Sequence, residues 1–375
     1  MNNLGIPREI SKLLIVTSDR KFKDYFQHLQ QVFIYVTNRC NLHCEQCLYK
    51  PWLRQGEELK VKVGMSLLAE FRKMGADKLS ILGGEPFIYK QLPELIKFSK
   101  EVGYNYIRLD TNGQFNPKLL ETEGIFNLDE ITFSLDGDNP DINDPLRGIG
   151  VFNKCVRNIR KAISLGYNVN ITCCVHRGNI GRDKNGGLLI DRMICFAESL
   201  GVSRINFHPL FKMGVSRDEW AGETDIDPDD WRETYEIIRA NIDNLKYKIP
   251  VRIPQRFLNT EKFDENPAYY GYCPAKMGER VLIHPNGQIQ ICALMIGTTN
   301  SVAHYKITDN EIHITWENNP NLNELSKFDL DNPTCCTNQT RDFGNLTPLC
   351  ISFKPKQDEY IWERLDKKWV LKFRE

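Results

Sequence analysis

The segment Val36–Lys50 reads VTNRCNLHCEQCLYK, and it begins at the end of the apolar, β-rich run Val32–Thr37 (VFIYVT). Three cysteines, Cys40, Cys44 and Cys47, follow this expected strand with the spacing C-x3-C-x2-C. Three thiolates can hold three corners of a 4Fe–4S cube and leave the fourth iron open. A zinc site is the alternative, but this spacing lacks the paired CxxC or Cys/His arrangement that structural zinc sites use.

From about residue 32 to 210, short β-rich runs alternate with helix-length segments. The pattern predicts further strands at Lys78–Leu82, Tyr106–Asp110, Glu130–Leu135, Asn168–Val175 and Arg204–Pro209. It predicts helices at Val61–Met74, Leu92–Val102, Val151–Leu165 and Asp191–Leu200. Such alternation favours a parallel sheet with right-handed crossovers. The expected fold is α/β, a partial (β/α)6 TIM-like barrel whose ligands lie beyond the carboxyl ends of the strands.

The pattern changes beyond a helix that is expected at Trp231–Leu245. The stretch Arg280–Ala293 (RVLIHPNGQIQICA) predicts a hairpin, because Asn286-Gly287 between alternating runs is a strong turn signal. We expect an N-terminal extension at 1–31, the barrel at 32–245 and a small C-terminal α+β domain at 246–375.

The composition argues against several classes of partner. The 375 residues carry 49 basic and 49 acidic side chains, so a net charge of zero gives no electrostatic reason to expect nucleic acid or an anionic membrane. No apolar run reaches the about 18 residues that a membrane-spanning helix needs. The N-terminus also lacks the apolar core of a signal peptide. We therefore expect a cytoplasmic protein that binds neither nucleic acid nor membrane.

The chain contains twelve cysteines, which in a reducing compartment indicate metal ligands more than disulfides. Cys155, Cys173, Cys174 and Cys195 fall inside apolar helix or strand patterns. We expect these four to pack as small hydrophobic residues. The other eight gather in two groups, between residues 40 and 47 and between residues 273 and 350.

Polar motifs follow the expected strands in order. Ser80–Pro86 (SILGGEP) ends the second strand, Thr111–Gly113 (TNG) ends the third, and Ser134–Gly137 (SLDG) ends the fourth. Arg147 comes next, in the run RGIGVF. Taken singly, a motif such as GGEP is equally compatible with a plain βα turn. In this order, and with the cysteine spacing, they resemble the motifs of the radical S-adenosylmethionine (SAM) superfamily over roughly residues 32–210.

The resemblance implies a cofactor and a reaction. It implies a 4Fe–4S cluster on Cys40, Cys44 and Cys47, whose open iron chelates the amino and carboxylate groups of SAM. One electron from the cluster then cleaves SAM to a 5′-deoxyadenosyl radical, which abstracts a hydrogen atom from the substrate.

The resemblance also implies which residues contact the cofactor. Gly83 and Gly84 would let the backbone approach the ligand closely, and Glu85 with nearby carbonyls would meet its ammonium group. Ser134 and Asp136 would reach the ribose hydroxyls or the methionine end. Arg147 would pair with the cofactor carboxylate. The complete expected set is Gly83, Gly84, Glu85, Pro86, Asn112, Ser134, Asp136 and Arg147.

One position departs from the family pattern. Family members often carry an aromatic residue just before the third cysteine, where it packs beside the adenine, but this chain has Gln46 there. Adenine contact from that position is therefore in doubt. Tyr49 is a candidate substitute, unless it packs on the loop.

The second cysteine group contains Cys273, Cys292, Cys335, Cys336 and Cys350. It resembles the SPASM and twitch extensions that hold auxiliary iron–sulfur clusters in many family members. The dense cysteine run of a full SPASM domain is absent, so a twitch-like domain with one 4Fe–4S cluster is expected. Its ligands would be Cys273, Cys292, Cys350 and one of the adjacent pair, since neighbouring thiols cannot easily ligate one cube. Four thiolates would also suit zinc, which stays an alternative.

Two classes of function follow. The first is a radical SAM oxidoreductase that takes electrons from a donor such as flavodoxin or ferredoxin. Its substrate would be a peptide, or a sugar or aminocyclitol-type metabolite, which it would modify, epimerise or oxidise. The roughly 30 residues before the first strand leave no room for a peptide-recognition domain, which slightly favours a small substrate or a peptide delivered by a partner. The second class is a non-catalytic iron–sulfur electron carrier or a zinc-binding scaffold.

Overall fold

The structure is a computed structural model. It describes residues 14–17, 20–53, 56–210, 226–270, 273–275, 277–296, 301–309, 311–317, 344–350, 360–365 and 368–373. By its internal contacts the chain separates into two compact units. The first comprises Met1–His43, Cys47–Ile131 and Pro274–Lys327, and the second comprises Cys44–Gln46, Thr132–Cys273 and Phe328–Glu375.

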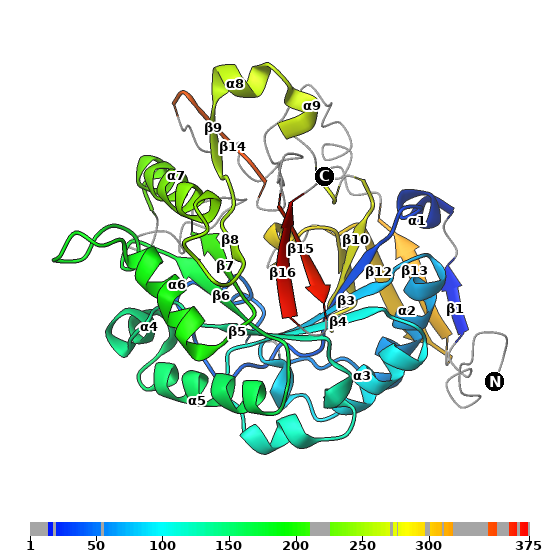
Figure 1. The fold of residues 1–375 in the computed structure, drawn as a ribbon. Coiled ribbons are helices and arrows are strands. Elements are labelled where there is room, and N and C mark those ends of the chain that lie inside the picture. Colours follow the sequence, from blue (N-terminus) through cyan, green and yellow to red (C-terminus); the bar gives the residue numbers. More distant parts are fainter. Residues whose placement is uncertain are drawn as a thin grey trace. The chain divides into compact units, whose positions relative to one another are not determined.

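A sheet in the order β1-β13-β12-β11-β10-β2-β3-β4 forms the centre of the first unit. Its parallel core has the strands β2 (Gln31–Tyr35), β3 (Lys78–Leu82) and β4 (Tyr106–Thr111). Two amphipathic helices, α2 (Val61–Lys73) and α3 (Leu92–Glu101), pack against each other and beside β2 and β4 (Figure 1). The apolar side chains that these elements bury explain why alternating patterns form this layer.

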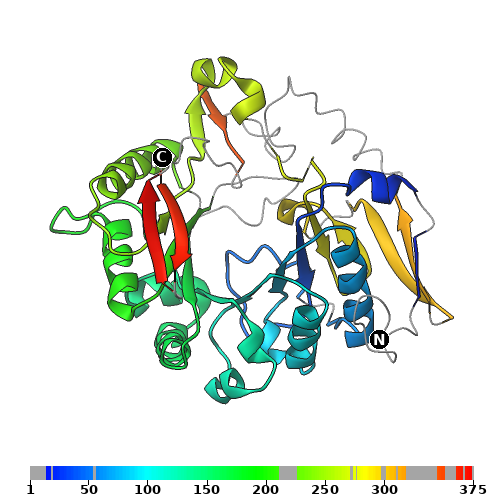
Figure 2. The ribbon, with the colours of Figure 1, turned by 45° about the vertical axis from the view of Figure 1, so that its right-hand side comes forward.

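The N-terminal residues contribute to the first unit. The strand β1 (Leu14–Thr17) pairs in parallel with β13 (Glu311–Trp316) at the edge of the sheet, and Figure 2 shows them side by side. The helix α1 (Arg20–Tyr25) buries Phe22, whose ring lies 6.1 Å from that of Phe71 on α2. Residues that the sequence indicated only as an extension therefore add a strand and a helix.

The hairpin expected at Arg280–Ala293 is present. It consists of β10 (Arg280–Ile283) and β11 (Gln288–Gln290), which pair antiparallel. Gly287 sits in its turn at φ +92°, and a Cβ there would lie 2.8 Å from the carbonyl oxygen of Tyr305. Both facts require glycine. On its other side β10 pairs in parallel with β2, with Arg280 opposite Gln31.

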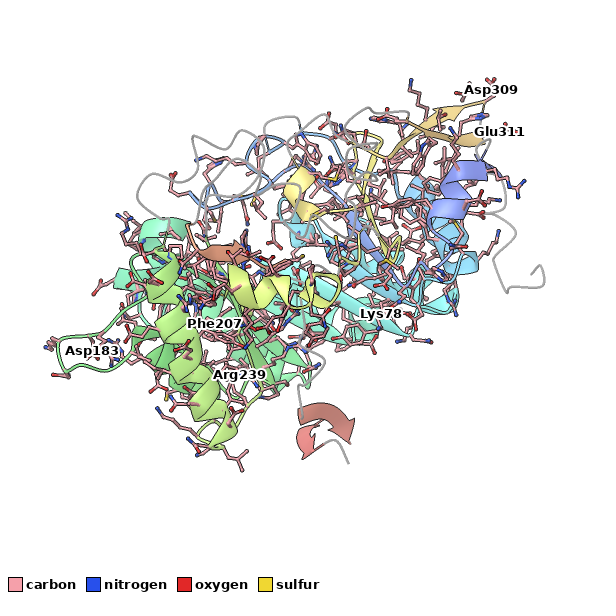
Figure 3. All side chains as sticks on the ribbon, turned by 90° about the horizontal axis from the view of Figure 1, so that it is seen from above. Lys78, Asp183, Phe207, Arg239, Asp309 and Glu311 are labelled. Carbon is pink, nitrogen blue, oxygen red and sulfur yellow. The ribbon has the colours of Figure 1, made fainter. Side chains whose placement is uncertain are left out.

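The strand β12 (Ala303–Thr308) completes the sheet between β11 and β13. Asp309 and Glu311 lie at the turn that joins β12 to β13, as Figure 3 shows. Asp309 has a positive φ of 50°, as a residue in such a tight turn can.

The second unit continues the alternation of strands and helices. The strand β5 (Glu130–Ser134) runs into it from the first unit, and β6 (Val169–Val175), β7 (Arg204–Pro209) and β8 (Val251–Arg252) pair in parallel in that order. Its longer helices are α4 (Pro140–Arg147), α5 (Val151–Ser164), α6 (Leu189–Leu200) and α7 (Pro228–Asp243). The short helices are α8 (Thr260–Asp264) and α9 (Pro267–Tyr270).

Two small antiparallel pairs complete this unit. β9 (Phe257–Asn259) pairs with β14 (Leu346–Pro348), and β15 (Tyr360–Leu365) pairs with β16 (Lys368–Phe373). The first pair joins segments that are far apart in the sequence, whereas β15 and β16 are consecutive strands.

The predicted α/β fold with a parallel core is confirmed, and the predicted strands agree with the observed ones to within two residues. The predicted packing of four cysteines is only partly right. Cys155 and Cys173 are buried and Cys174 is half-buried, but Cys195 is exposed because it lies on the outer face of α6. Among the helices that the structure describes, none combines the length and apolar character needed to cross a membrane.

Candidate cofactor site at the cysteine loop

Cys40, Cys44 and Cys47 are half-buried in the loop after β2, and the ten cysteines that the structure describes form no disulfide. The Cys40 sulfur accepts a hydrogen bond from the Leu42 backbone N–H (3.4 Å) and another from the Asn112 side-chain amide (3.6 Å). The same amide donates to the Asn41 side chain at 2.8 Å. The polar turn after β4 therefore orients the first cysteine, as N–H donors do for a thiolate ligand.

The GGEP motif holds the loop through its backbone. The Gly84 N–H donates to the Thr37 carbonyl at 2.7 Å, and the Glu85 N–H donates to the Arg39 carbonyl at 2.9 Å. A Cβ on Gly84 would lie 2.0 Å from the Arg39 oxygen, and one on Gly83 would lie 2.9 Å from the Thr37 oxygen. The close approach for which these glycines are needed is thus to the cysteine loop itself. Their expected approach to the ligand stays a prediction.

Glu85 is fully buried and accepts three hydrogen bonds. They come from the Phe87 N–H (3.1 Å), the Thr111 hydroxyl (2.7 Å) and the Asn112 N–H (2.8 Å). Burial raises the pKa of the Glu85 carboxyl to about 7, although these hydrogen bonds lower it. Pro86 follows as the first residue of the short 3-10 helix that Glu85 caps. The carboxyl group therefore joins GGEP to the TNG turn, and its contact with the cofactor ammonium stays a prediction.

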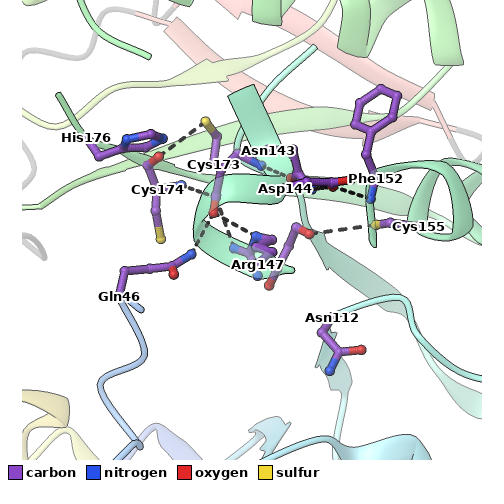
Figure 4. Close-up of polar contacts among 12 residues, drawn as sticks. Gln46, Asn112, Asn143, Asp144, Arg147, Phe152, Cys155, Cys173, Cys174 and His176 are labelled. Atoms are coloured by element: carbon purple, nitrogen blue, oxygen red, sulfur yellow. Dashed lines mark hydrogen bonds and ion pairs between the residues drawn. The ribbon is translucent and has the colours of Figure 1, made fainter. Parts of the chain in front are cut away.

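A buried polar cluster surrounds Asp136 in the second unit (Figure 4). One carboxylate oxygen accepts from Arg147 Nη2 (3.0 Å) and from the Cys174 N–H (2.8 Å). The other accepts from the Gln46 side-chain amide (2.7 Å) and lies 2.7 Å from Arg147 Nε. Ser134 is half-buried two residues earlier, at the end of β5. Asp136 and Arg147, both expected to contact the cofactor, are engaged with each other in this structure.

The environment of Arg147 raises the pKa of its guanidinium. Burial lowers the pKa of its guanidinium, but the negative charges of Asp136, Cys44 and Cys174 more than offset this and raise it. Arg147 thus stays cationic close to Cys44, the second cysteine of the loop.

Tyr49 does not take the place of the missing aromatic residue. It is 4% exposed, and its ring stacks on Tyr35 with centroids 4.8 Å apart and an interplanar angle of 6°. The ring of Trp52 lies edge-on to that of Tyr49, with centroids 5.5 Å apart. The Tyr49 hydroxyl donates to the Asn38 side chain at 2.7 Å. Tyr35 also stacks on His284 at the hairpin turn, with centroids 4.5 Å apart. The alternative that Tyr49 packs on the loop is therefore the correct one.

The second cysteine group is described in part. Cys292 follows β11 and caps a short 3-10 helix, Ala293–Met295. Cys350 follows β14 and packs against the buried cluster of Leu258, Phe263 and Leu349, against which Tyr269 and Tyr270 also pack. Cys273 comes three residues after Tyr270. Cys335 and Cys336 lie outside the described residues.

The residues at the loop fit an iron–sulfur cluster by their chemistry. Within the part of the chain that the structure describes, no three His, Cys, Asp or Glu side chains are already arranged as a metal site. The fit therefore rests on three half-buried thiols in one loop, on N–H donors directed at Cys40 and on the cation beside Cys44. These are the ligand type and the hydrogen bonds that hold such clusters.

The sequence did not reveal the bonds of Gln46 and Cys174 to Asp136. Cys174 donates through its backbone N–H, which no side-chain pattern reports. Gln46 offered a signal of its own, since an amide stands where the resemblance led us to expect an aromatic ring. A buried amide needs hydrogen-bond partners, and a search for carboxylates at strand ends would have found Asp136.

Known proteins resemble this chain. Residues 34–183 match the model of the radical SAM superfamily. A probable GTP 3′,8-cyclase of Sulfolobus acidocaldarius is 25% identical over 72% of this chain and 82% of its own length. The mycofactocin maturase MftC of Mycobacterium tuberculosis H37Rv is 24% identical over 77% of this chain and 71% of its own length.

Solved structures share the fold. SuiB of Streptococcus suis, solved with SAM, superimposes with a TM-score of 0.59 at 18% identity, and this chain covers 64% of it. SuiB bound to its precursor peptide SuiA gives a TM-score of 0.57. The cysteine loop, the strand-end motifs and the family match agree. Residues 34–183 are a radical SAM domain, and the protein is an enzyme that depends on a 4Fe–4S cluster and SAM.

Proposed function

We propose that this enzyme modifies a peptide by radical chemistry. The observation that carries the proposal is the likeness to SuiB, which covers 75% of this chain and so extends well beyond residues 34–183. SuiB was solved with a precursor peptide, and MftC is named a maturase. Fold likeness at this identity does not carry a substrate with it, so the peptide is our inference.

The protein's own residues prepare the cofactor site. Cys40, Cys44 and Cys47 would hold the cluster, which with SAM supplies reductive cleavage and hydrogen-atom abstraction. Leu42 and Asn112 orient the Cys40 sulfur. Glu85 would hold the GGEP and TNG turns in register through its three hydrogen bonds.

We further propose one auxiliary 4Fe–4S cluster on Cys273, Cys292, Cys350 and one of Cys335 and Cys336, with flavodoxin or ferredoxin as electron donor. Support comes from the half-buried state of the three described cysteines. It also comes from Cys350 and Tyr270, which pack against the same buried cluster, since Tyr270 precedes Cys273 by three residues.

The substrate class can be tested with fractions of the host cell. The reconstituted, reduced enzyme is incubated with SAM and either the peptide fraction or the small-molecule filtrate, and 5′-deoxyadenosine is measured. We expect the peptide fraction to accelerate its formation and protease treatment of that fraction to remove the effect. Acceleration by the filtrate alone, or by GTP, would assign a small-molecule substrate instead.

The radical chemistry itself is tested by Cys44→Ala. Loss of one of three thiolates should reduce SAM cleavage by at least about 100-fold, because the cube loses a corner. Cys195→Ala is the matched control, since this exposed cysteine on α6 should leave cleavage unchanged. Equal activity of the Cys44 variant and the wild type would refute the assignment of the loop.

A further inference from the structure

Gln46 is held in one orientation by a buried ion pair. Its side-chain amide donates to Asp136 at 2.7 Å, and Asp136 pairs with Arg147 at 2.7 Å. Gln46 is 6% exposed, Arg147 is 7% exposed and Asp136 is fully buried. The Gln46 side chain is therefore neither a surface group nor free to rotate.

The chemistry of Asp136 fixes which end of the Gln46 amide faces it. An ionised carboxylate only accepts hydrogen bonds, so the NH2 group must point to Asp136 and the carbonyl oxygen must point away. This carboxylate forms a buried ion pair with Arg147. Among the described residues, the buried Gln46 Oε1 has no hydrogen-bond partner. A buried acceptor without a donor costs free energy, which a ligand with an N–H or O–H can recover.

The neighbouring side chains of Asp136 and Tyr49 are already engaged and do not offer that ligand a hydrogen-bond acceptor. Both oxygens of Asp136 already accept from Arg147, Gln46 and the Cys174 N–H. Tyr49 is enclosed by Tyr35 and Trp52. Figure 4 shows the Gln46 side chain directed at the carboxylate that Arg147 also contacts. Gln46 Oε1 is a buried acceptor of this cluster without a hydrogen-bond partner among the described residues, and it lies one residue before the third cysteine of the loop.

We propose that Gln46 Oε1 accepts a hydrogen bond from the nucleoside half of SAM. The superfamily's chelation of iron by the methionine end leaves three donors, the exocyclic adenine amine and the two ribose hydroxyls. A hydrogen bond from the cofactor to a buried amide oxygen then replaces the aromatic contact that this position lacks. Gln46 acts as a specificity-determining residue, and Asp136 and Arg147 act as positioning residues behind it.

The inference rests on the cofactor and not on the peptide substrate, so binding alone tests it. Dissociation constants are measured by equilibrium dialysis on the reconstituted, unreduced enzyme, in which SAM is not cleaved. The ligands are SAM and three analogues, in which an oxygen replaces the adenine amine, or the 2′- or 3′-hydroxyl is removed. In the wild type we expect one analogue to bind about 3- to 10-fold more weakly than SAM. That analogue identifies the donor.

The variant Gln46→Met separates this contact from a merely structural role. It should bind SAM about 3- to 10-fold more weakly than the wild type and should not distinguish SAM from the identified analogue. A general loss of structure would weaken all four ligands and keep their order. If Gln46→Met does not load iron, Gln46→Asn takes its place, since its shorter amide withdraws the acceptor, and the same outcome is expected.

Two results would overturn the proposal. One is a wild-type enzyme that binds all three analogues as tightly as SAM. The other is a Gln46 variant that keeps the wild-type discrimination against every analogue. Cys195→Ser, on the exposed face of α6, serves as the control whose dissociation constants should match those of the wild type.

Discussion

Gly84 occupies a position at which one methyl group decides whether the cysteine loop can form. Its Cα faces the Arg39 carbonyl so closely that an added Cβ would lie 2.0 Å from the oxygen and 3.0 Å from the Cys40 nitrogen. Both neighbours are backbone atoms and cannot move away without shifting the first cysteine. The need for glycine is therefore steric, and it arises from the fold of the loop.

Gly84→Ala should lower the free energy of unfolding by about 1–3 kcal/mol or more, because overpacking displaces backbone. It should also reduce the iron bound after reconstitution. Urea denaturation and iron analysis measure the two effects. Gly187→Ala is the control, since a Cβ there meets its nearest atom, of Asp183, at 3.5 Å and needs no rearrangement. Identical behaviour of both variants would contradict the steric argument.

At this scale the sequence predicted which polar residues lie at the strand ends, but it did not predict the hydrogen bonds that they form. The motifs around Glu85, Asn112 and Asp136 were found because short polar runs at strand ends are visible in the sequence. Their partners depend on backbone N–H groups, such as those of Phe87 and Cys174. A sequence pattern lists side chains, and it contains no information on which backbone group points where.

At the scale of elements, the hairpin β10–β11 carries a buried histidine at its turn. His284 is fully buried between Tyr35 and Trp52, with ring centroids 4.5 and 4.7 Å away. Burial lowers the pKa of His284 from 6.5 to about 3, against the effect of its hydrogen bond with Gln290. The folded hairpin therefore contains a neutral imidazole.

This burial makes stability depend on pH. The unfolded chain binds a proton below pH 6.5 that the folded chain excludes, so stability is present above that pH and is lost as the pH falls toward 3. Between pH 7 and pH 5 the wild type should lose about 2 kcal/mol more unfolding free energy than His284→Phe. Urea titrations at the two pH values measure the difference. His313→Gln, at a more exposed site on β13, should follow the wild type, and a loss equal in all three proteins would rule out His284 as the cause.

The parallel strands were predictable because each is a short apolar run bounded by turn residues. The β10–β11 turn was equally legible from Asn286-Gly287. The pairing of β10 with β2 was not, because about 245 residues of sequence separate the partners, and local periodicity does not report long-range pairing. For the same reason the sequence did not predict β1, a four-residue strand whose partner β13 lies about 300 residues further along the chain.

At the scale of the whole molecule, the question is how many clusters the chain holds. With both proposed clusters the reconstituted protein should contain about eight irons per chain, and Cys292→Ala or Cys350→Ala should contain about four. These variants should still cleave SAM but should turn over little substrate, whereas Cys44→Ala should not cleave SAM.

Iron analysis and 5′-deoxyadenosine assays on the same samples measure both properties. Cys155→Ala, which removes a buried cysteine of α5 outside either group, is the control that should keep all the iron. Zinc in place of the second set of iron atoms, or equal loss of SAM cleavage in all the variants, would contradict the proposed division.

The aromatic stack behind the cysteine loop has an optical consequence. Tyr49 and Trp52 belong to the segment that directly follows the third cysteine, and Trp52 is 5% exposed with its ring edge-on to both Tyr49 and His284. An indole shielded from water in this way emits at shorter wavelength, and rigid ring pairs produce near-ultraviolet circular dichroism. Iron–sulfur chromophores report only whether the cluster has assembled. The fluorescence of Trp52 reports whether the polypeptide around it is folded before the iron–sulfur cluster has assembled.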